Sequence, residues 1–436
     1  MSLALTGCGS QAAPSNGGSA TKGAINWWSW TPDNDLAARE IAAFNKQYPN
    51  IKVTYKKVPI DNYAAVLRPA LSSSSGPDVF SVNASGAFSG KTFAAYAYDL
   101  TPAMKKLLGA DWKSKIDPGS TKAFTINGRL VAQTFGRVGA GMMWINQDIF
   151  NKYNLKPPTN MAEWKSLCAT FRSKGLGCFR EGLSGTAGFV VDTLHSIANN
   201  VEPGYWTGAL AGKRKWDDPT MVKSLQILGD MAHNGILDKG ATGILQYPDV
   251  NNAFLSGKVP MVQMGTWYSQ YATVSSLTAA LAGAGVPAGT KHISIMPTTF
   301  PDVAGTGNAV SLFADPDVAQ AVNAKSKNRN AAVTFAIWLG STKPGAEVVA
   351  NNMDELPVLQ GSGPDFTKIT LVNKAQQPAL VNVIAQLAKA NEPRNLGLAD
   401  QTNQAIINAA QGVVNGTKSA KDGAAGVAAA AASAGQ

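Results

Sequence analysis

The chain has 436 residues, enough for two or three domains, and only 15% of them are charged, which excludes a charge-stabilised disordered chain and a coiled coil. No run of ~18 uninterrupted apolar residues occurs, so we expect no membrane-spanning helix. The net charge of +10 arises from basic residues scattered in twos and threes. Without a basic stripe interleaved with aromatic residues, nucleic-acid binding is disfavoured, and a weakly basic surface facing an anionic cell wall or membrane is favoured.

Strands and helices alternate in the first part of the chain. The apolar run over 24–30 predicts a buried strand, and a helix capped by Asp33 or Asp35 follows and ends at Pro49. Alternating apolar and polar residues predict a half-exposed strand over 51–55. A further helix and a strand over 79–82 complete a β-α-β-α-β pattern, which indicates a parallel sheet with helices on its faces.

The same alternation returns after a turn at Asn127-Gly128. We predict strands over 130–135, 142–146, 260–264 and 292–296. Helices are predicted to begin at Asn160, at Asp218-Pro219 and at Arg329. The last part is expected to be helical up to Gly423, with a frayed alanine-rich tail beyond it. The sequence therefore predicts an α/β protein with two lobes.

Cys8 belongs to Leu5-Thr6-Gly7-Cys8, which resembles the end of a bacterial lipoprotein signal, where the cysteine is acylated and becomes the mature N-terminus. The segment that follows is rich in Ser, Gly, Ala and Asn, so 1–23 is interpreted as a signal remnant and flexible tether. The charged region and most of the apolar region of such a signal do not precede Cys8, and we expect this chain to be soluble. A chance match of four residues is the alternative.

Cys168 and Cys178 form an even pair once Cys8 is set aside. In an exported protein they can close a small disulfide, although two buried free thiols are the alternative. The histidines are far apart along the chain and none has a cysteine nearby, so no metal site is expected.

Catalytic signatures are absent from the sequence. It has no nucleophile elbow, phosphate loop or zinc-protease helix motif, and Gly305-Thr306-Gly307 is too short to indicate a dinucleotide site. We therefore expect neither an enzyme nor a cofactor.

Several segments, in this order, resemble an extracellular solute-binding protein of a bacterial ABC importer, in the sugar-binding family that includes maltose-binding protein. These segments are FNKQYPNIKV (44–53), GPDV (76–79), NGRL (127–130), MWINQDIF (143–150), GKVPM (257–261) and GTW (265–267). The similarity covers nearly the whole chain from Ala24.

This resemblance implies a two-lobed, periplasmic-binding-protein-like (Venus-flytrap) fold of the α/β class. Its three hinge crossings are expected near Phe135, Met296 and Thr342. The first lobe would comprise 24–135 plus 298–342, and the second 136–297 plus 343–430, leaving a frayed tail at 431–436. A ligand would bind between the lobes, which close over it.

Candidate ligand-binding residues follow from the resemblance and from sugar chemistry, because aromatic rings suit the apolar faces of a pyranose and polar groups suit its hydroxyls. The candidates are Trp30, Thr31, Asp33, Asn83, Trp267, Tyr268, Glu355 and Arg394. Trp206 and Phe189 are secondary candidates. For Trp30 the alternative is a core position, for Asp33 a helix cap, and for Glu355 and Arg394 a solvated surface charge.

The chain departs from maltose-binding protein in two places. Val82 replaces a ligand-contacting tryptophan, and the tryptophan of the late cleft helix is absent near Ala399-Asp400. The resemblance therefore points to sugar as the ligand class but away from maltodextrin.

The resemblance implies a monomeric, lipid-anchored receptor on the outer face of the bacterial membrane that delivers a carbohydrate, most naturally an oligosaccharide, to permease subunits. One alternative keeps the fold but changes the ligand to a polyamine or peptide. Another is a secreted carbohydrate-active enzyme, which would need two carboxylates facing each other across the cleft.

Overall fold

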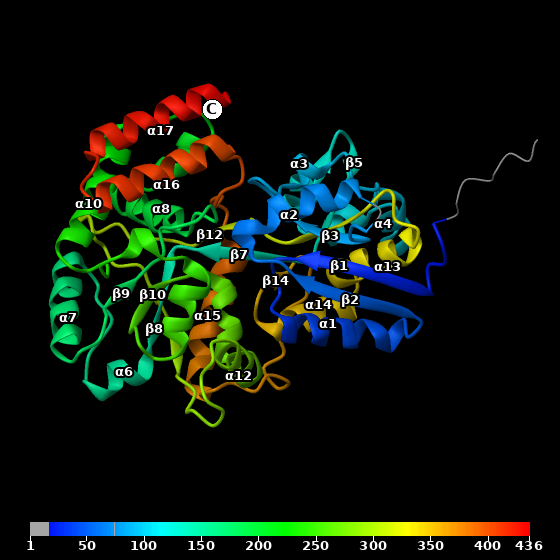
Figure 1. The fold of residues 1–436 in the computed structure, drawn as a ribbon, viewed down its shortest axis with the longest axis horizontal. Coiled ribbons are helices and arrows are strands. Elements are labelled where there is room, and N and C mark those ends of the chain that lie inside the picture. Colours follow the sequence, from blue (N-terminus) through cyan, green and yellow to red (C-terminus); the bar gives the residue numbers. More distant parts are fainter. Residues whose placement is uncertain (1–16, 74) are drawn as a thin grey trace, which may run out of the picture.

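The computed structural model describes residues 17–73 and 75–436, so Cys8 and most of the predicted tether lie outside the described residues. These residues form two α/β lobes that lie side by side (Figure 1). Within the described part of the chain, no helix is long and apolar enough to cross a membrane. The two-lobed α/β fold expected from the sequence is confirmed.

The first lobe is built on a five-stranded sheet in which β1 runs parallel to both of its neighbours. The strand order is β2 (Ile51–Lys57), β1 (Gly23–Ser29), β3 (Val79–Val82), β13 (Ala319–Val322) and β6 (Gln133–Thr134). Its helices are α1 (Asn34–Gln47), α2 (Ile60–Ser72), α3 (Gly90–Phe93), α4 (Thr101–Leu108), α5 (Pro118–Ala123), α13 (Arg329–Ser341) and α14 (Lys343–Asn352). A two-stranded hairpin, β4 (Thr125–Ile126) and β5 (Arg129–Leu130), follows α5. Trp27, Phe44 and Phe335 pack ring to ring and join β1, α1 and α13 in one core.

The second lobe surrounds a four-stranded sheet with a hydrophobic cluster on each face. The strand order is β11 (Ile295–Thr299), β8 (Met142–Asn146), β10 (Met261–Gln263) and β9 (Phe179–Arg180). Successive residues of β8 alternate between the clusters, with Met143 and Ile145 in one and Met142 and Trp144 in the other. Its helices are α6 (Gln147–Lys152), α7 (Met161–Ser173), α8 (Phe189–Val201), α9 (Tyr205–Leu210), α10 (Pro219–His233), α11 (Asn251–Leu255), α12 (Val274–Gly283), α15 (Gln377–Lys389), α16 (Asp400–Val414) and α17 (Ala420–Ala434).

A three-stranded antiparallel sheet connects the lobes. Its order is β12 (Phe313–Pro316), β7 (Gly136–Ala140) and β14 (Leu356–Pro357). β7 follows β6 of the first lobe after one residue, β12 leads into β13, and β14 follows α14. All three strands are therefore segments where the chain passes between the lobes.

The packing of the core favours two crossings that lie later in the chain than the expected ones. Phe300, Val303 and Val310 pack in a cluster of the second lobe, although the resemblance implies that 298–312 belong to the first. Val349 of α14 packs in the core of the first lobe, although the resemblance implies that 343–352 belong to the second. These contacts favour crossings at β12 and β14 over crossings near Met296 and Thr342.

The predicted disulfide is present and links α7 to the segment before β9. Cys168 and Cys178 are both fully buried, and their Cα atoms are 5.0 Å apart. The backbone N–H of Cys178 donates to Asp238, which fixes the same segment from the other side.

The alanine-rich end of the chain is an ordered helix, and the expectation of a frayed tail is wrong. α17 begins after Ser419, which caps it by accepting from the N–H of Asp422, and it packs against α16 and α10. Val427 and Ala431 are buried in this contact, and the side chain of Gln436 accepts from Thr402 at 2.7 Å. Alanine has the highest helix propensity, and its small side chain lets two helices approach closely, so this composition suits a packed helix.

Candidate functional site

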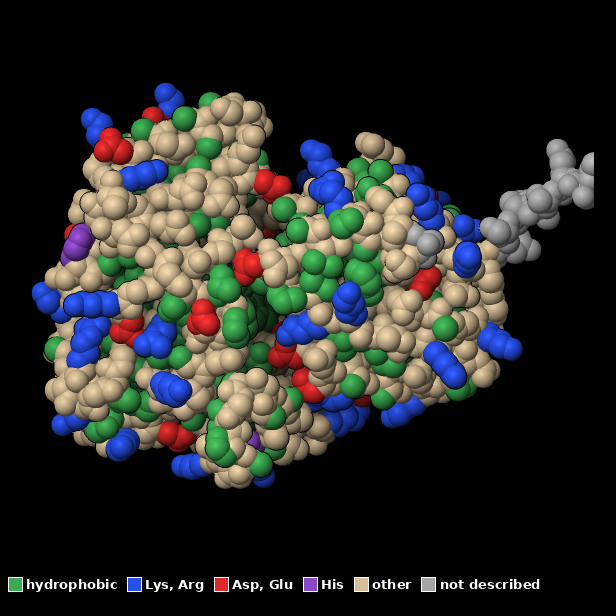
Figure 2. All heavy atoms as spheres, viewed as in Figure 1, with side chains coloured by type: hydrophobic (Ala, Val, Ile, Leu, Met, Phe, Trp, Pro, Cys, Tyr) green, Lys and Arg blue, Asp and Glu red, His purple; other side chains and the backbone are tan. Residues whose placement is uncertain are grey.

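An aromatic group in the first lobe surrounds Trp30. Trp30 follows β1 and packs against Tyr63 and Phe88, with ring centroids 5.1 and 4.7 Å away. Only 8% of Trp30 is exposed, and it packs in the hydrophobic core of the first lobe. Figure 2 shows a notch between the lobes, with hydrophobic and acidic side chains along it.

The polar candidates of the first lobe follow the strands β1 and β3. Asp33 precedes α1 but makes no side-chain cap; it pairs instead with Lys57 and accepts a hydrogen bond from the hydroxyl of Tyr271 on the second lobe at 3.0 Å. Thr31 is partly exposed, and its carbonyl accepts from Ser29. Asn83 follows β3 and accepts from the N–H of Ala84, its own neighbour. Asp33 is therefore the member of this group that reaches the opposite lobe.

Trp267 is the centre of the aromatic group on the second lobe. It lies in a 3-10 helix over Thr266–Ala272, is partly exposed, and donates from Nε1 to the hydroxyl of Tyr247 at 3.1 Å. The ring of Phe189 lies 6.2 Å from that of Trp267, and the guanidinium carbon of Arg394 lies over the Trp267 ring at 4.7 Å. Trp267 and Arg394, two residues predicted separately, are thus in direct contact.

Arg394 is held rigidly by buried carboxylates. Asp192 of α8 accepts from both Nε and Nη2 of Arg394, at 2.8 and 2.7 Å, in a bidentate pair. The carboxylate of Asp315 accepts the backbone N–H of Arg394 at 3.1 Å. Burial lowers the pKa of Arg394, but Asp192, Asp317 and Asp315 together raise it by more, so the pKa lies above its usual value and the guanidinium stays charged beside Trp267.

Two of the predicted contacts are buried. Tyr268 is fully buried in a cluster of the second lobe, where its hydroxyl donates to Asn251, and this position makes it part of the core. Glu355 is 6% exposed, and neither of its carboxylate oxygens has a hydrogen-bond partner among the described residues. Burial raises the pKa of Glu355 well above its usual range, and the neighbouring acids Asp317 and Asp354 add to this. A neutral Glu355 beside β14 is consistent with a structural role in the connecting sheet.

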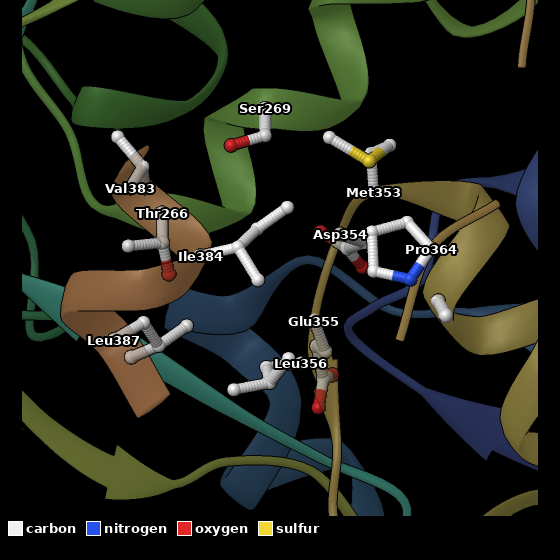
Figure 3. A pocket seen from close by; sticks show the side chains of 11 residues that line it. Thr266, Ser269, Met353, Asp354, Glu355, Leu356, Pro364, Val383, Ile384 and Leu387 are labelled. Atoms are coloured by element: carbon white, nitrogen blue, oxygen red, sulfur yellow. The ribbon is translucent and has the colours of Figure 1, made fainter. Parts of the chain in front are cut away.

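A small cavity lies between α15, the 3-10 helix over Thr266–Ala272 and the segment 353–356 (Figure 3). It has room for about 20 Å³ of solvent, which suits roughly one water molecule and is far too small for a sugar ring. Thr266 and Ser269 line one side, and Asp354 and Leu356 line another.

Sequence reasoning missed several residues at this boundary. Tyr271 lies four residues after Trp267, so a signal for it was present in the sequence. Tyr247 and Asp192 lie in segments without any ligand-binding pattern, and only the fold brings them to Trp267 and Arg394. Among the described residues, no group of three or more His, Cys, Asp or Glu side chains is arranged to hold a metal ion.

The chain belongs to the bacterial extracellular solute-binding protein family, because the model of this family matches residues 28–346. The resemblance identified from the sequence is confirmed. No curated protein gives a significant match.

Solved structures with the same fold cover almost the whole chain. A protein from a study of xylan utilization by the thermophilic bacterium Caldanaerobius polysaccharolyticus is 23% identical, with a TM-score of 0.72, over 93% of this chain and 98% of its own. Maltose-bound MalE3 of T. maritima is 15% identical, with a TM-score of 0.72, over 93% of this chain and 98% of its own. The GacH receptor of Streptomyces glaucescens, solved unliganded and with acarbose, is 18% identical, with a TM-score of 0.69, over 94% of this chain and 97% of its own.

Proposed function

We propose that this chain is the substrate-binding component of an ABC importer and that it captures a carbohydrate, of oligosaccharide size, between its lobes. The observation that carries this proposal is the pair of aromatic groups, one around Trp30 in the first lobe and one around the partly exposed Trp267 in the second. A pyranose offers apolar faces to such rings, and Asp33 and Arg394 supply polar groups for its hydroxyls. Of the three similar structures, one comes from a study of xylan utilization, one is bound to maltose and one was solved with acarbose, which supports the same ligand class.

The mechanism we propose is capture without chemistry. The lobes close over the sugar by bending at β7, β12 and β14, and the free energy for closure comes from contacts that both lobes make with the ligand. Thr31 and Asn83 are proposed as further contacts from the first lobe. Delivery to a membrane permease, acylation at Cys8 and a place on the outer face of the membrane belong to the same proposal, and they rest on the lipoprotein-like sequence and on the family.

A thermal-shift screen tests the ligand class. Maltose, xylo-oligosaccharides, chitin oligosaccharides and acarbose are compared with spermidine and a short peptide at equal concentrations. A ligand that binds only the folded state at 100 times its Kd stabilises the protein by about 2.7 kcal/mol, which raises the melting temperature measurably. Stabilisation by a sugar supports the proposal. Stabilisation by spermidine or the peptide, with none by any sugar, would show that the ligand is a non-sugar solute.

A further inference from the structure

A carboxylate of the first lobe is bound by backbone groups of the second. Asp61 lies in the first turn of α2. Its Oδ1 atom accepts from the backbone N–H of Thr186 at 2.7 Å and of Ala187 at 3.1 Å, and the hydroxyl of Thr186 lies 3.3 Å away. These partners are 125 and 126 residues away along the chain, so the contact exists only because the lobes lie against each other.

The loop that receives Asp61 is shaped for close approach. It leads into α8, whose first turn has no side-chain cap of its own. Gly185 has a φ of +85°, and a Cβ atom at this position would come within 2.5 Å of the Asp61 carboxylate. Within the part of the chain that the structure describes, the N–H groups of Thr186 and Ala187 donate to no acceptor other than Asp61. The positive end of α8 adds to the attraction for a carboxylate at this loop.

A second set of bonds joins the lobes at another place along their boundary, where α1 lies beside α12 (Figure 1). Arg39 of α1 donates to the hydroxyls of Ser275 and Ser276 at 2.9 and 2.8 Å. The aromatic residues of the site belong to the segments that carry these contacts: Trp30 precedes α1, and Phe189 follows the loop that binds Asp61. The lobes are therefore joined by polar bonds made entirely by the protein.

We propose that Asp61 is a positioning residue that sets the affinity for the ligand by favouring the closed arrangement of the lobes without touching the ligand. The inference rests on the proposed function for its link to sugar affinity. Hydrogen bonds to a charged acceptor are stronger than those between neutral groups, and moving the lobes apart breaks all of those that Asp61 makes across the boundary. A bond present in only one of two arrangements shifts their equilibrium by its differential free energy, and the apparent affinity changes by the same factor.

Hydrogen–deuterium exchange of the protein without sugar tests the contact directly, because the N–H groups of Thr186 and Ala187 depend on Asp61 for protection. In Asp61→Ala we expect exchange in a peptide covering 184–188 to accelerate by roughly tenfold or more. Asp61→Asn keeps an oxygen acceptor without the charge and should give an intermediate rate. Unchanged exchange in Asp61→Ala would overturn the proposal.

Asp148→Ala is the matched control. Asp148 also lies in the first turn of a helix, and it accepts one backbone N–H, from Ser294 at 2.8 Å, but both partners belong to the second lobe. This variant should accelerate exchange at Ser294 and leave the 184–188 peptide unchanged. Equal acceleration of that peptide in both variants would mean a general loss of stability and would contradict a specific interlobe contact.

Binding of maltose, xylotriose and chitotriose then tests the link to affinity by surface plasmon resonance. For each probe that binds the wild-type protein, we expect Asp61→Ala to raise the dissociation rate about tenfold, with Asp148→Ala unchanged. Accelerated exchange with unaltered affinity would refute the role in binding. If no probe and no other sugar binds while exchange still accelerates, the proposed sugar function fails and the role in sugar affinity fails with it, whereas the interlobe contact stands. If a sugar binds but exchange is unchanged in Asp61→Ala, the proposed function stands and the proposed role of the interlobe contact is wrong.

Discussion

The guanidinium group of Arg394 lies over the ring of Trp267, with its carbon atom 4.7 Å from the ring centroid. The pair is fixed on both sides, because Asp192 holds Arg394 in a bidentate ion pair and Tyr247 accepts from the indole N–H of Trp267. Side chains that are already ordered lose little conformational entropy when a ligand arrives. The second lobe thus presents a pre-organised combination of an aromatic ring and a charged donor.

Replacing Trp267 with alanine should weaken sugar binding strongly while changing stability little. We expect a loss of about 1–3 kcal/mol in binding free energy, because the apolar face of the sugar loses its aromatic partner. Trp267 is partly exposed, so the melting temperature of the protein without sugar should fall only slightly. Isothermal titration calorimetry with the sugar found in the screen measures the first effect, and calorimetric unfolding measures the second.

Trp164→Ala provides the contrast for this experiment. Trp164 is fully buried against Phe179 and Phe300, so its removal should cost about 3–5 kcal/mol of stability. Sugar affinity of the folded fraction should stay close to that of the wild type. Unaltered affinity in Trp267→Ala, or unfolding as severe as in Trp164→Ala, would show that Trp267 is not the aromatic ring that packs against the sugar.

The sequence predicts the elements of this protein better than it predicts how they meet. The strands and helices around Trp27, Phe44 and Trp144 were predicted because apolar periodicity is a local signal. The pairing of Asp192 with Arg394 joins residues 202 positions apart and depends on how α8 docks against a distant loop, which no local pattern encodes. The composition led to the expectation of a frayed tail at the C-terminus, because the sequence of an alanine-rich segment is the same whether or not a partner helix covers it.

Two glycines of α17 test whether this helix is packed as the structure shows. Gly426 faces open space, so Gly426→Ala should stabilise the protein by about 0.5–1 kcal/mol through the higher helix propensity of alanine. A Cβ at Gly423 would lie 3.2 Å from the Cβ of Ala409 and 3.3 Å from Cδ1 of Leu225, so Gly423→Ala should lose that gain or destabilise the protein. Chemical denaturation of both variants decides this. Equal effects of the two substitutions would contradict the packing of α17 on α16 and α10.

A buried carboxyl in the second lobe should make stability depend on pH. Glu181 is fully buried and accepts from the hydroxyl of Thr193 at 2.6 Å, and burial raises its pKa to about 8. Because the folded state holds a proton that the unfolded chain releases, this contribution is fully present below about pH 4.5 and is lost as the pH rises through about 8. The free energy of unfolding should therefore fall by up to about 1.4 kcal/mol per pH unit within this window.

Glu181→Gln removes the ionisable carboxyl and should reduce this decline in the free energy of unfolding. The stability of the variant relative to the wild type should therefore increase between pH 5 and pH 8. Urea denaturation at a series of pH values measures the effect. Glu163→Gln serves as the control, because Glu163 is exposed and hydrogen bonds from Thr159 hold its pKa below its usual range, which places its titration outside this window. Parallel curves for Glu181→Gln and the wild type would show that Glu181 does not carry the dependence.

The last prediction concerns motion and separates a receptor from an enzyme. If the lobes bend about β7, β12 and β14, saturating sugar should favour the closed arrangement, in which Trp30 and Trp267 contact the ligand from both sides. Small-angle X-ray scattering should then give a smaller radius of gyration with the sugar than without it, and Asp61→Ala should show the larger difference because its sugar-free form opens more readily. The same sample, kept for hours, should return the sugar chemically unchanged. A radius that does not change in either protein would count against closure, and recovery of a cleaved sugar would refute capture without chemistry and favour a carbohydrate-active enzyme.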